Sequence, residues 1–193
     1  MEGEVRWLDI ASVELLPGNA KDHDIGAIVS SIAQFGFLDP VGLNTATGHA
    51  FDGNGRLEAL RRMKLSGYVG KDGAEMRGPP EGVREAGGAW LAPFWRFEVL
   101  AEREQAVVVA LNKTNELGGW DYDVLSQVLQ NLATTPDGLA GTGFSREDLD
   151  SIMAAHTADV SGAGFQEQGD SLADGVEYVT CPACGHKFLK GEV

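Results

Sequence analysis

Residues 51–57, FDGNGRL, mark the corner between a predicted strand and a predicted helix. Apolar residues lead into it, two glycines interrupt it, and a segment with helical spacing follows. Glycine lets a backbone turn sharply and approach a ligand closely, so we expect a strand to end at Asp52 and a helix to begin at about Gly55. The first N–H groups of a helix lack internal partners and carry partial positive charge. This corner is therefore a candidate anion-binding turn.

The charges around this turn favour the same interpretation. Arg56 would add a planar, bidentate donor for a phosphate or carboxylate. The expected helix also carries Arg61, Arg62 and Lys64 against a single acid, Glu58, within a chain of net charge −14. The alternative is an ordinary strand-to-helix corner whose arginines point into solvent, because a short Gly-x-Gly is a weak motif.

Hydrophobic spacing predicts the surrounding elements of a mixed α/β (α+β) domain. Strands are expected at 5–13, 41–44, 49–52 and 94–99. Helices are expected from Asp24 to about Phe35, at 55–64, at 102–115, from Asp121 onward, and after a capping-box-like pair at Ser145 and Asp148. The helix at 102–115 is rich in Ala and Val and is predicted to be buried. Trp120 is predicted to be a core anchor.

Three segments differ from this pattern. Residues 65–93 are rich in Gly and Pro and form an irregular insert, which is either a lid over a site or a tolerated surface insertion. The polar, Gly-rich residues 156–175 are predicted to be a linker. It would join a domain at 1–155, with a helical extension at 121–155, to a small knuckle at 176–193.

Composition excludes several classes of protein. The chain has 193 residues, of which 43% are hydrophobic, enough for a core without disulfides. A net charge of −14 argues against binding nucleic acid over the whole surface, so DNA contact would need a local basic patch or a partner protein. We find no signal peptide and no membrane-spanning stretch. A cytoplasmic location is therefore expected.

Three stretches in order resemble the ParB/sulfiredoxin superfamily, in particular ParB-like proteins of phages and mobile elements. They are GHAFDGNGRLEALRR at 48–62, IAQFGFLDPV at 32–41 and ALNKTNELGGWD at 110–121, and the resemblance covers about residues 5–155. It implies a small mixed sheet with helices that binds a nucleotide at the glycine turn. Partition proteins of the superfamily bind CTP, sulfiredoxins bind ATP, and other members are phosphotransferases or proteins described as nucleases.

The resemblance places the nucleotide phosphates on Gly53, Asn54, Gly55 and Arg56. Sulfiredoxins need a cysteine where this chain has Asn54, so sulfiredoxin chemistry is excluded. Partition proteins carry a second arginine where this chain has Gly55. They also continue into larger DNA-binding and dimerisation domains, so chromosome partitioning is not expected.

Five further residues are candidates for the same site. Asp24 and Asp52 could act as a base or hold Mg²⁺, but roles as a helix cap for Asp24 and as a turn former for Asp52 are the stronger alternatives. His23 could be a second base or an ordinary surface histidine. Asn112 and Asn115 lie three apart on one helix and could reach the ligand, or could only cross-link the end of that helix.

The two cysteines indicate a separate candidate site for Zn²⁺. Cys181 and Cys184 have the Cys-x-x-Cys-Gly shape of half a zinc ribbon, with His186 close by. A structural zinc site needs four ligands, and a homodimer would supply the missing ones. A two-stranded hairpin or a tail without metal are the alternatives.

The sequence thus predicts a ParB-like protein that binds a nucleoside triphosphate (ATP or CTP), with Mg²⁺, and acts in DNA metabolism. NTP hydrolysis or phosphoryl transfer would follow from positioning and charge neutralisation. One alternative is a non-enzymatic module that binds DNA or a protein. A second alternative is a metal-dependent DNA nuclease.

Overall fold

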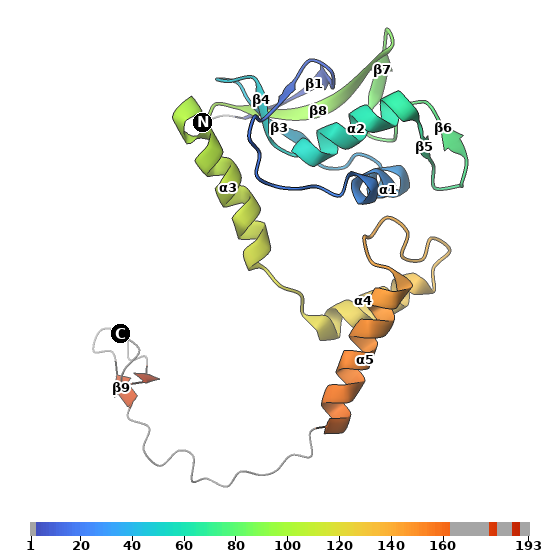
Figure 1. Cartoon of the computed structure of the whole chain (residues 1–193), viewed down its shortest axis with the longest axis vertical. Coiled ribbons are helices and arrows are strands. Elements are labelled where there is room, and N and C mark those ends of the chain that lie inside the picture. The colour runs from blue at the N-terminus through green and yellow to red at the C-terminus, as the bar shows by residue number, and fades with distance from the viewer. Residues whose placement is uncertain (1–2, 163–177, 181–186, 190–193) are drawn as a thin grey trace. The chain divides into compact units, whose positions relative to one another are not determined.

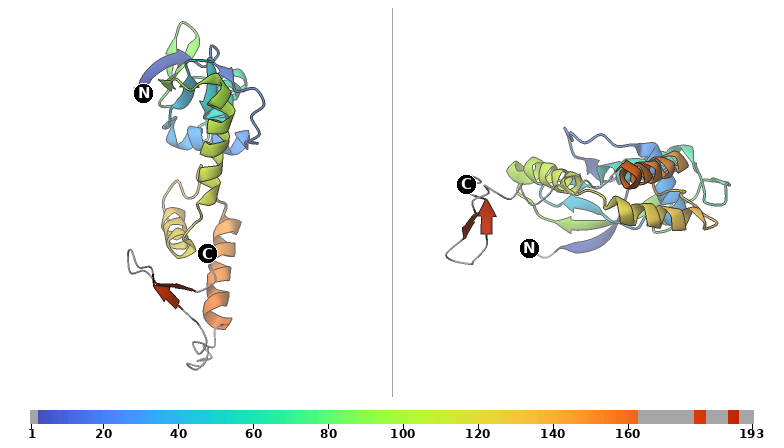
Figure 2. Two further views of the ribbon diagram at one scale, coloured as in Figure 1. Left: turned by 90° about the vertical axis from the view of Figure 1, so that its left-hand side faces the viewer. Right: turned by 90° about the horizontal axis from the view of Figure 1, so that it is seen from below.

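The computed structural model describes residues 3–162, 178–180 and 187–189, with side chains up to Ala155. The chain divides into two units, Met1–Met153 and Ala154–Val193. The first unit contains the sheet and the candidate site and is shown in two further orientations in Figure 2.

A six-stranded mixed sheet forms the centre of the first unit (Figure 1). Its order is β1 (Glu4–Asp9), β8 (Ala89–Phe97), β3 (Val41–Asn44), β4 (His49–Asp52) and β2 (Glu14–Leu15), with β7 (Arg84–Ala86) also paired to β8. The β3–β4 hairpin is antiparallel, whereas β8 runs parallel to β3 and antiparallel to β1. The mixed sheet that the sequence predicts is therefore present.

Two helices pack against each other and against one face of this sheet, α1 (Ile25–Phe35) and α2 (Asn54–Ser66). Both begin as the sequence predicts: Asp24 caps α1, and α2 follows the glycine turn directly. The helices and the sheet enclose the main core, whose fully buried side chains include Leu57, Leu60, Met63, Val41 and Phe94. This core fixes the first turn of α2 relative to β4.

The prediction of a buried helix at 102–115 is wrong. Helix α3 (Ala101–Leu117) contacts β4, but only Glu104 and Val108 are buried, and Val109 and Leu117 are 60% and 74% exposed. Its apolar residues are spread around the helix and form no single stripe, so they cannot all face the core. Composition alone overestimated the burial of this helix.

The insert is more regular than predicted. It contains a hairpin of β5 (Tyr68–Val69) and β6 (Glu75–Met76), and then β7, which pairs with the start of β8. Strand β8 begins at Ala89, well before the predicted start at Phe94. Trp90, Ala92 and Phe94 are buried in alternation, as in a strand with one face in the core. Pro93 obscured this pattern in the sequence, because proline is unfavourable inside a strand.

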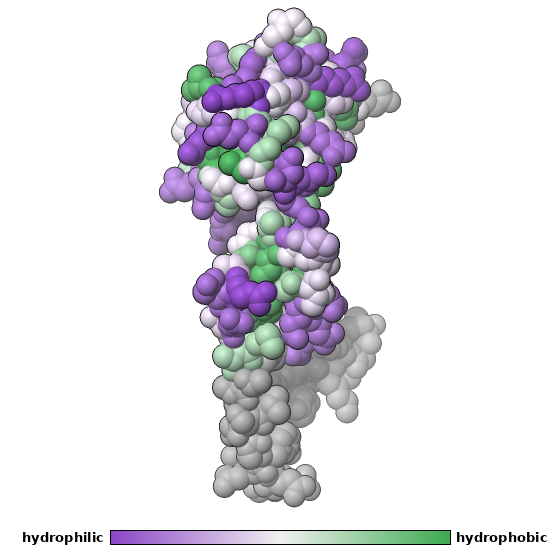
Figure 3. Space-filling view, turned by 90° about the vertical axis from the view of Figure 1, so that its right-hand side faces the viewer, coloured by the Kyte–Doolittle hydropathy of each residue, from purple (hydrophilic) through white to green (hydrophobic). Residues whose placement is uncertain are grey.

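Two further helices, α4 (Tyr122–Ala133) and α5 (Arg146–Gly162), share a small core of Leu125, Leu129 and Leu149. In Figure 3, hydrophobic residues show between these helices, while hydrophilic residues cover most of the sheet-containing part. The capping pair is confirmed, because Ser145 and Asp148 hydrogen-bond reciprocally. Trp120 is 62% exposed and packs edge-to-face on Phe144, so it is not a core anchor.

Helix α5 continues past Ala155, so the first residues of the predicted linker are helical. In the second unit, β9 (Tyr178–Thr180) pairs antiparallel with β10 (Lys187–Leu189), and both strands lie within the predicted knuckle at 176–193. Cys181, Cys184 and His186 lie outside the described residues, and zinc binding stays a prediction. Within the part of the chain that is described, no helix is long and apolar enough to span a membrane.

Candidate anion-binding pocket

The glycine turn leaves the first turn of α2 open. Strand β4 ends at Asp52, and Gly53 is the N-cap, with φ 74° and no side chain to cap the helix. The first helical hydrogen bond runs from Leu57 N to Gly53 O at 2.9 Å. The backbone N–H groups of residues 54–56 therefore lack intrahelical acceptors, as in any helix, and their partial positive charge is available to an anion.

The second glycine of the motif has a different role from the one predicted. Gly55 is already helical, and positive φ occurs at Gly53 and not at Gly55. A Cβ at Gly55 would lie 2.7 Å from Cγ of His23, so glycine is needed for the approach of the histidine ring. Asn19 Nδ2 lies 3.5 Å from His23 Nε2. Gly55 therefore lets the segment before α1 close against α2.

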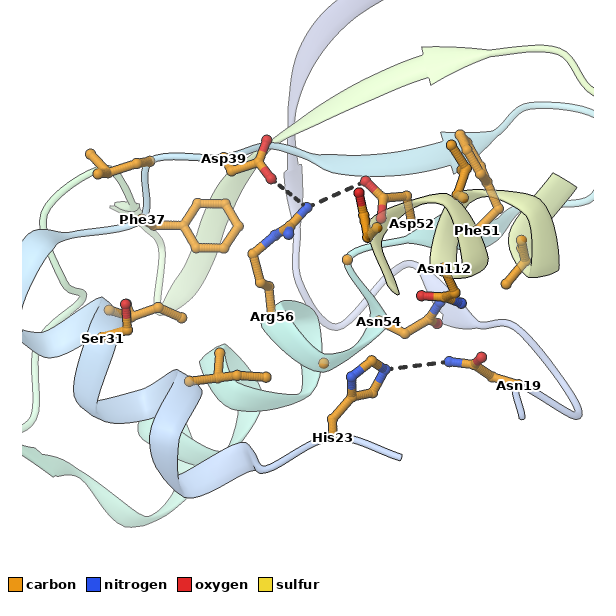
Figure 4. Close-up of a pocket in the computed structure, with 18 of the residues that line it drawn as sticks. Asn19, His23, Ser31, Phe37, Asp39, Phe51, Asp52, Asn54, Arg56 and Asn112 are labelled. Carbon is orange, nitrogen blue, oxygen red and sulfur yellow. Dashed lines mark hydrogen bonds and ion pairs between the residues drawn. The ribbon is translucent and has the colours of Figure 1, made fainter. Parts of the chain in front are cut away.

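Arg56 lies over the turn and is held by acids (Figure 4). Its Nη2 atom lies 2.9 Å from Asp39 Oδ2 and 3.4 Å from Asp52 Oδ2, and it donates to the Pro40 carbonyl oxygen at 3.2 Å. The Nε atom is buried and has no hydrogen-bond partner in the described part of the chain. The guanidinium of Arg56 is thus held in place at the N-terminal end of α2, and two carboxylates offset its charge.

These groups line a cavity of about 430 Å³. Most of the predicted site residues come together in its wall: His23, Asp52, Gly53, Asn54, Gly55, Arg56, Asn112 and Asn115. Apolar side chains from α1, the α1–β3 loop, β4 and α3 complete it, among them Ile28, Phe37, Phe51 and Leu111. The cavity combines an apolar wall with convergent polar groups, as small-molecule sites do.

Two predicted residues are engaged by the protein itself. The Asp24 carboxylate accepts from Ala27 N at 2.9 Å, as the cap of α1, and Asp24 is not among the described residues that line the cavity. Asn54 lines the cavity, but its Oδ1 accepts from Leu16 N at 3.1 Å and its side chain is buried. The structure therefore favours the capping alternative for Asp24 and gives Asn54 a structural bond.

Asp39 is a site residue that sequence reasoning missed. It lies in the loop before β3, and the register of the β3–β4 hairpin pairs Gly42 with Asp52. An antiparallel hairpin brings the residues before its first strand beside those after its second strand. The predicted hairpin of 41–44 and 49–52 brings the residues near 39 and near 56 to the same end of the sheet, but its register, which shifts between Gly42 and Leu43, does not follow from the residue pattern.

The predicted basic island is not a continuous surface. Arg61 is half-buried and donates through Nε to Ile10 O at 2.9 Å and through Nη2 to Val13 O. Arg62 and Lys64 are exposed and do not line the cavity. Arg61 therefore links the β1–β2 connection to α2 through hydrogen bonds. Its guanidinium is not available to an anion-binding patch.

A buried carboxylate anchors α3 beside the cavity. Glu104 is 5% exposed and accepts from Asn44 Nδ2 at 2.8 Å and Thr47 Oγ1 at 2.6 Å, and its Oε2 lies 3.1 Å from His49 Nδ1. Burial of the carboxyl raises its pKa, but the hydrogen bonds from Thr47, His49 and Asn44 together outweigh that effect and lower the pKa of Glu104. The anchor is therefore charged at neutral pH.

A second contact holds the other end of the same helix. Lys21 Nζ lies 2.6 Å from Glu116 Oε1, and these two residues are 38% and 46% exposed. Val108 supplies the apolar contact between the two anchors. These contacts place Asn112 and Asn115 in the cavity wall, although most of α3 is exposed.

Comparison with known proteins identifies the architecture. No family model matches the chain, and no curated protein sequence matches it. Among solved structures, it is similar to the C-terminally truncated chromosome-partitioning protein ParB from Caulobacter crescentus, complexed with CTP-γ-S. The TM-score is 0.55 at 16% identity, and the match covers 82% of this chain and 86% of ParB. This chain has a ParB-like fold.

The ParB-like fold confirms the predicted fold class. The three stretches that carry the resemblance also lie around one cavity: the α1–β3 passage, the glycine turn and the Asn-containing part of α3. The insert residues 65–93 do not line this cavity, and the turn at Pro80–Val83 packs behind the α1–β3 loop through the bond from Phe37 N to Glu81 O.

Proposed function

We propose that this ParB-like protein binds a nucleoside triphosphate in the cavity at the N-terminus of α2. The observation that carries the proposal is the open first turn of α2, with a left-handed glycine as its N-cap and Arg56 above it. Free N–H groups at a helix end favour phosphate. ParB from Caulobacter crescentus, which shares this fold, is complexed with CTP-γ-S.

The apolar part of the cavity suits the base and ribose. Ile28, Phe37 and Leu111 contribute to a wall next to the amide side chains of Asn112 and Asn115. Amides can donate and accept hydrogen bonds, so they can read a base edge or hold a ribose hydroxyl. A volume of about 430 Å³ lies within the range of small-ligand sites.

Mg²⁺ fits the proposal as a partner of the nucleotide. The described residues contain no cluster of three or more metal-binding side chains that could hold an ion alone. Mg²⁺ is, however, commonly held by one or two carboxylates together with substrate phosphates. Asp39 and Asp52 are the carboxylates next to Arg56 that would meet such an ion.

Nucleotide binding is better supported than the recognition of DNA through a basic patch. Arg61 is bound to backbone carbonyls and Arg56 is paired with two acids. That leaves Arg62 and Lys64 as the exposed cations of α2 in a chain of net charge −14. Hydrolysis or phosphoryl transfer would use the same site, with Asp52 or His23 beside the phosphates.

Titration calorimetry with Arg56→Ala tests the proposal. The wild-type protein should bind at least one of ATP, CTP, GTP and UTP with Mg²⁺ at micromolar to millimolar concentration. Loss of a charged hydrogen-bond donor to phosphate should weaken binding about tenfold or more.

Arg62→Ala is the matched control, because it removes the same charge from an exposed position on the same helix. Its affinity should equal that of the wild type. Equal weakening by both variants would mean that general charge, and not this site, governs binding. No binding of any nucleotide by the wild-type protein would refute the proposed function.

A further inference from the structure

Arg56 is already occupied at the position where the proposed phosphate must bind. Its Nη2 atom contacts Asp39 at 2.9 Å, Asp52 at 3.4 Å and the Pro40 carbonyl at 3.2 Å. Its Nε atom is buried. Because Nη2 is the atom that carries these contacts, an anion that approaches it competes with a carboxylate of the protein.

The two carboxylates also lie at the positive end of α2. The guanidinium rests against the N-cap, since a Cβ at Gly53 would be 2.8 Å from Nη2. Acids are favoured near a helix N-terminus by the aligned peptide dipoles. Asp39 and Asp52 therefore act as the protein's own anions at the proposed phosphate position.

The backbone around Asp39 is held in place, whereas the ion pair between the Asp39 side chain and Arg56 is exposed to solvent. Phe37, two residues earlier, is buried and its N–H donates to Glu81 O at 2.7 Å. The Asp39 side chain itself is 69% exposed. Exposed ion pairs contribute little free energy, so the backbone holds Asp39 at the site while its side chain can be displaced.

We propose that Asp39 is a specificity-determining residue that competes with ligand phosphate for Arg56. A single phosphate that displaces the carboxylate exchanges one anion for another at Arg56 and gains few further contacts. A chain of phosphates can, because it also reaches the open N–H groups of α2. The pocket thereby selects polyphosphates and nucleoside triphosphates over orthophosphate and nucleoside monophosphates. This inference rests on the proposed function.

Calorimetry without Mg²⁺, using tripolyphosphate, orthophosphate and the four nucleoside triphosphates, tests Asp39→Asn against the wild type. The variant should bind tripolyphosphate about threefold to tenfold more tightly, since an exposed competing charge is removed. Its preference for tripolyphosphate over orthophosphate should shrink. Glu58→Gln, which removes an acid elsewhere on α2 and outside the cavity wall, should stay near wild type.

The outcomes separate this inference from the proposed function. If Asp39→Asn gains no affinity for tripolyphosphate, or loses affinity, the role of Asp39 is overturned even where the wild type binds nucleotides. If the variant gains affinity for tripolyphosphate but the wild type binds no nucleotide, the role of Asp39 stands and the proposed function fails. Equal melting temperatures of the two proteins establish that the exposed substitution leaves the fold intact.

Discussion

At the scale of single residues, the four arginines and lysines of α2 have separate roles although they lie within nine positions of the sequence. Arg56 faces the cavity, Arg61 binds backbone carbonyls, and Arg62 and Lys64 face solvent. Periodicity alone does not separate them, because the acceptors of Arg61 are contributed by the distant β1–β2 connection. The charge pattern therefore predicted a basic island that the fold divides.

Arg61→Ala should destabilise the protein without changing its ligand affinity. The substitution leaves the carbonyls of the buried residues Ile10 and Val13 without their charged donor. The expected loss in unfolding free energy is about 2–4 kcal/mol. Urea denaturation followed by circular dichroism measures it, with Arg62→Ala as the exposed control, which should change stability by less than about 0.5 kcal/mol.

If Arg61→Ala and Arg62→Ala were equally stable, the hydrogen bonds of Arg61 to the β1–β2 connection would not stabilise the fold. If folded Arg61→Ala bound nucleotide more weakly than the wild type, Arg61 would contribute to ligand binding as well.

At the scale of elements, α3 is held by polar contacts as well as by a small apolar cluster around Val108. Its Glu104 carboxylate bonds to the β3–β4 hairpin, and Lys21 pairs with Glu116 near its other end. A buried charge that is fully hydrogen-bonded specifies position, and removal of its charge leaves its partners incompletely satisfied. The placement of Asn112 and Asn115 in the cavity wall thus follows from residues outside the cavity.

Glu104→Gln should lower the unfolding free energy at neutral pH by about 2–3 kcal/mol. The sign of the pH dependence follows from the lowered pKa of Glu104. Its stabilising contribution is complete above the ordinary glutamate pKa of about 4.3 and is lost as pH falls through the lower pKa of the folded state. The difference between wild type and variant should therefore shrink in acid.

Urea denaturation of both proteins at pH 7 and at successively lower pH measures this difference. A difference that does not shrink once the pH falls below the ordinary glutamate pKa of about 4.3 would contradict a charged anchor. Gln keeps the volume and one acceptor, so the substitution removes the charge together with one hydrogen-bond acceptor.

The elements also show how far the sequence could predict the structure. The hairpin at 41–52 and the two helices around it follow from local signals: a cap at Asp24, alternating strands and a glycine turn before α2. The start of β8 and the exposure of α3 depend on pairing with distant strands. Asp39 reaches Arg56 through the register of the hairpin, which residue patterns leave open.

At the scale of the whole molecule, an acidic protein is proposed to bind an acidic ligand. The net charge of −14 repels phosphate at long range. The attraction of the phosphates must therefore come from short-range contacts with the N–H groups of α2, with Arg56 and with any accompanying cation. Salt screens the long-range repulsion more than these short contacts, which sets this protein apart from one that binds nucleic acid through a basic surface.

We propose that the open end of α2 receives the phosphates of the nucleotide. Heteronuclear NMR of ¹⁵N-labelled protein tests this by following the backbone amide signals of Asn54, Gly55 and Arg56 as a nucleoside triphosphate and Mg²⁺ are added. We predict that these three signals shift most strongly and saturate with the affinity found by calorimetry. Saturable shifts confined to other residues, or no shifts at millimolar nucleotide, would contradict the claim.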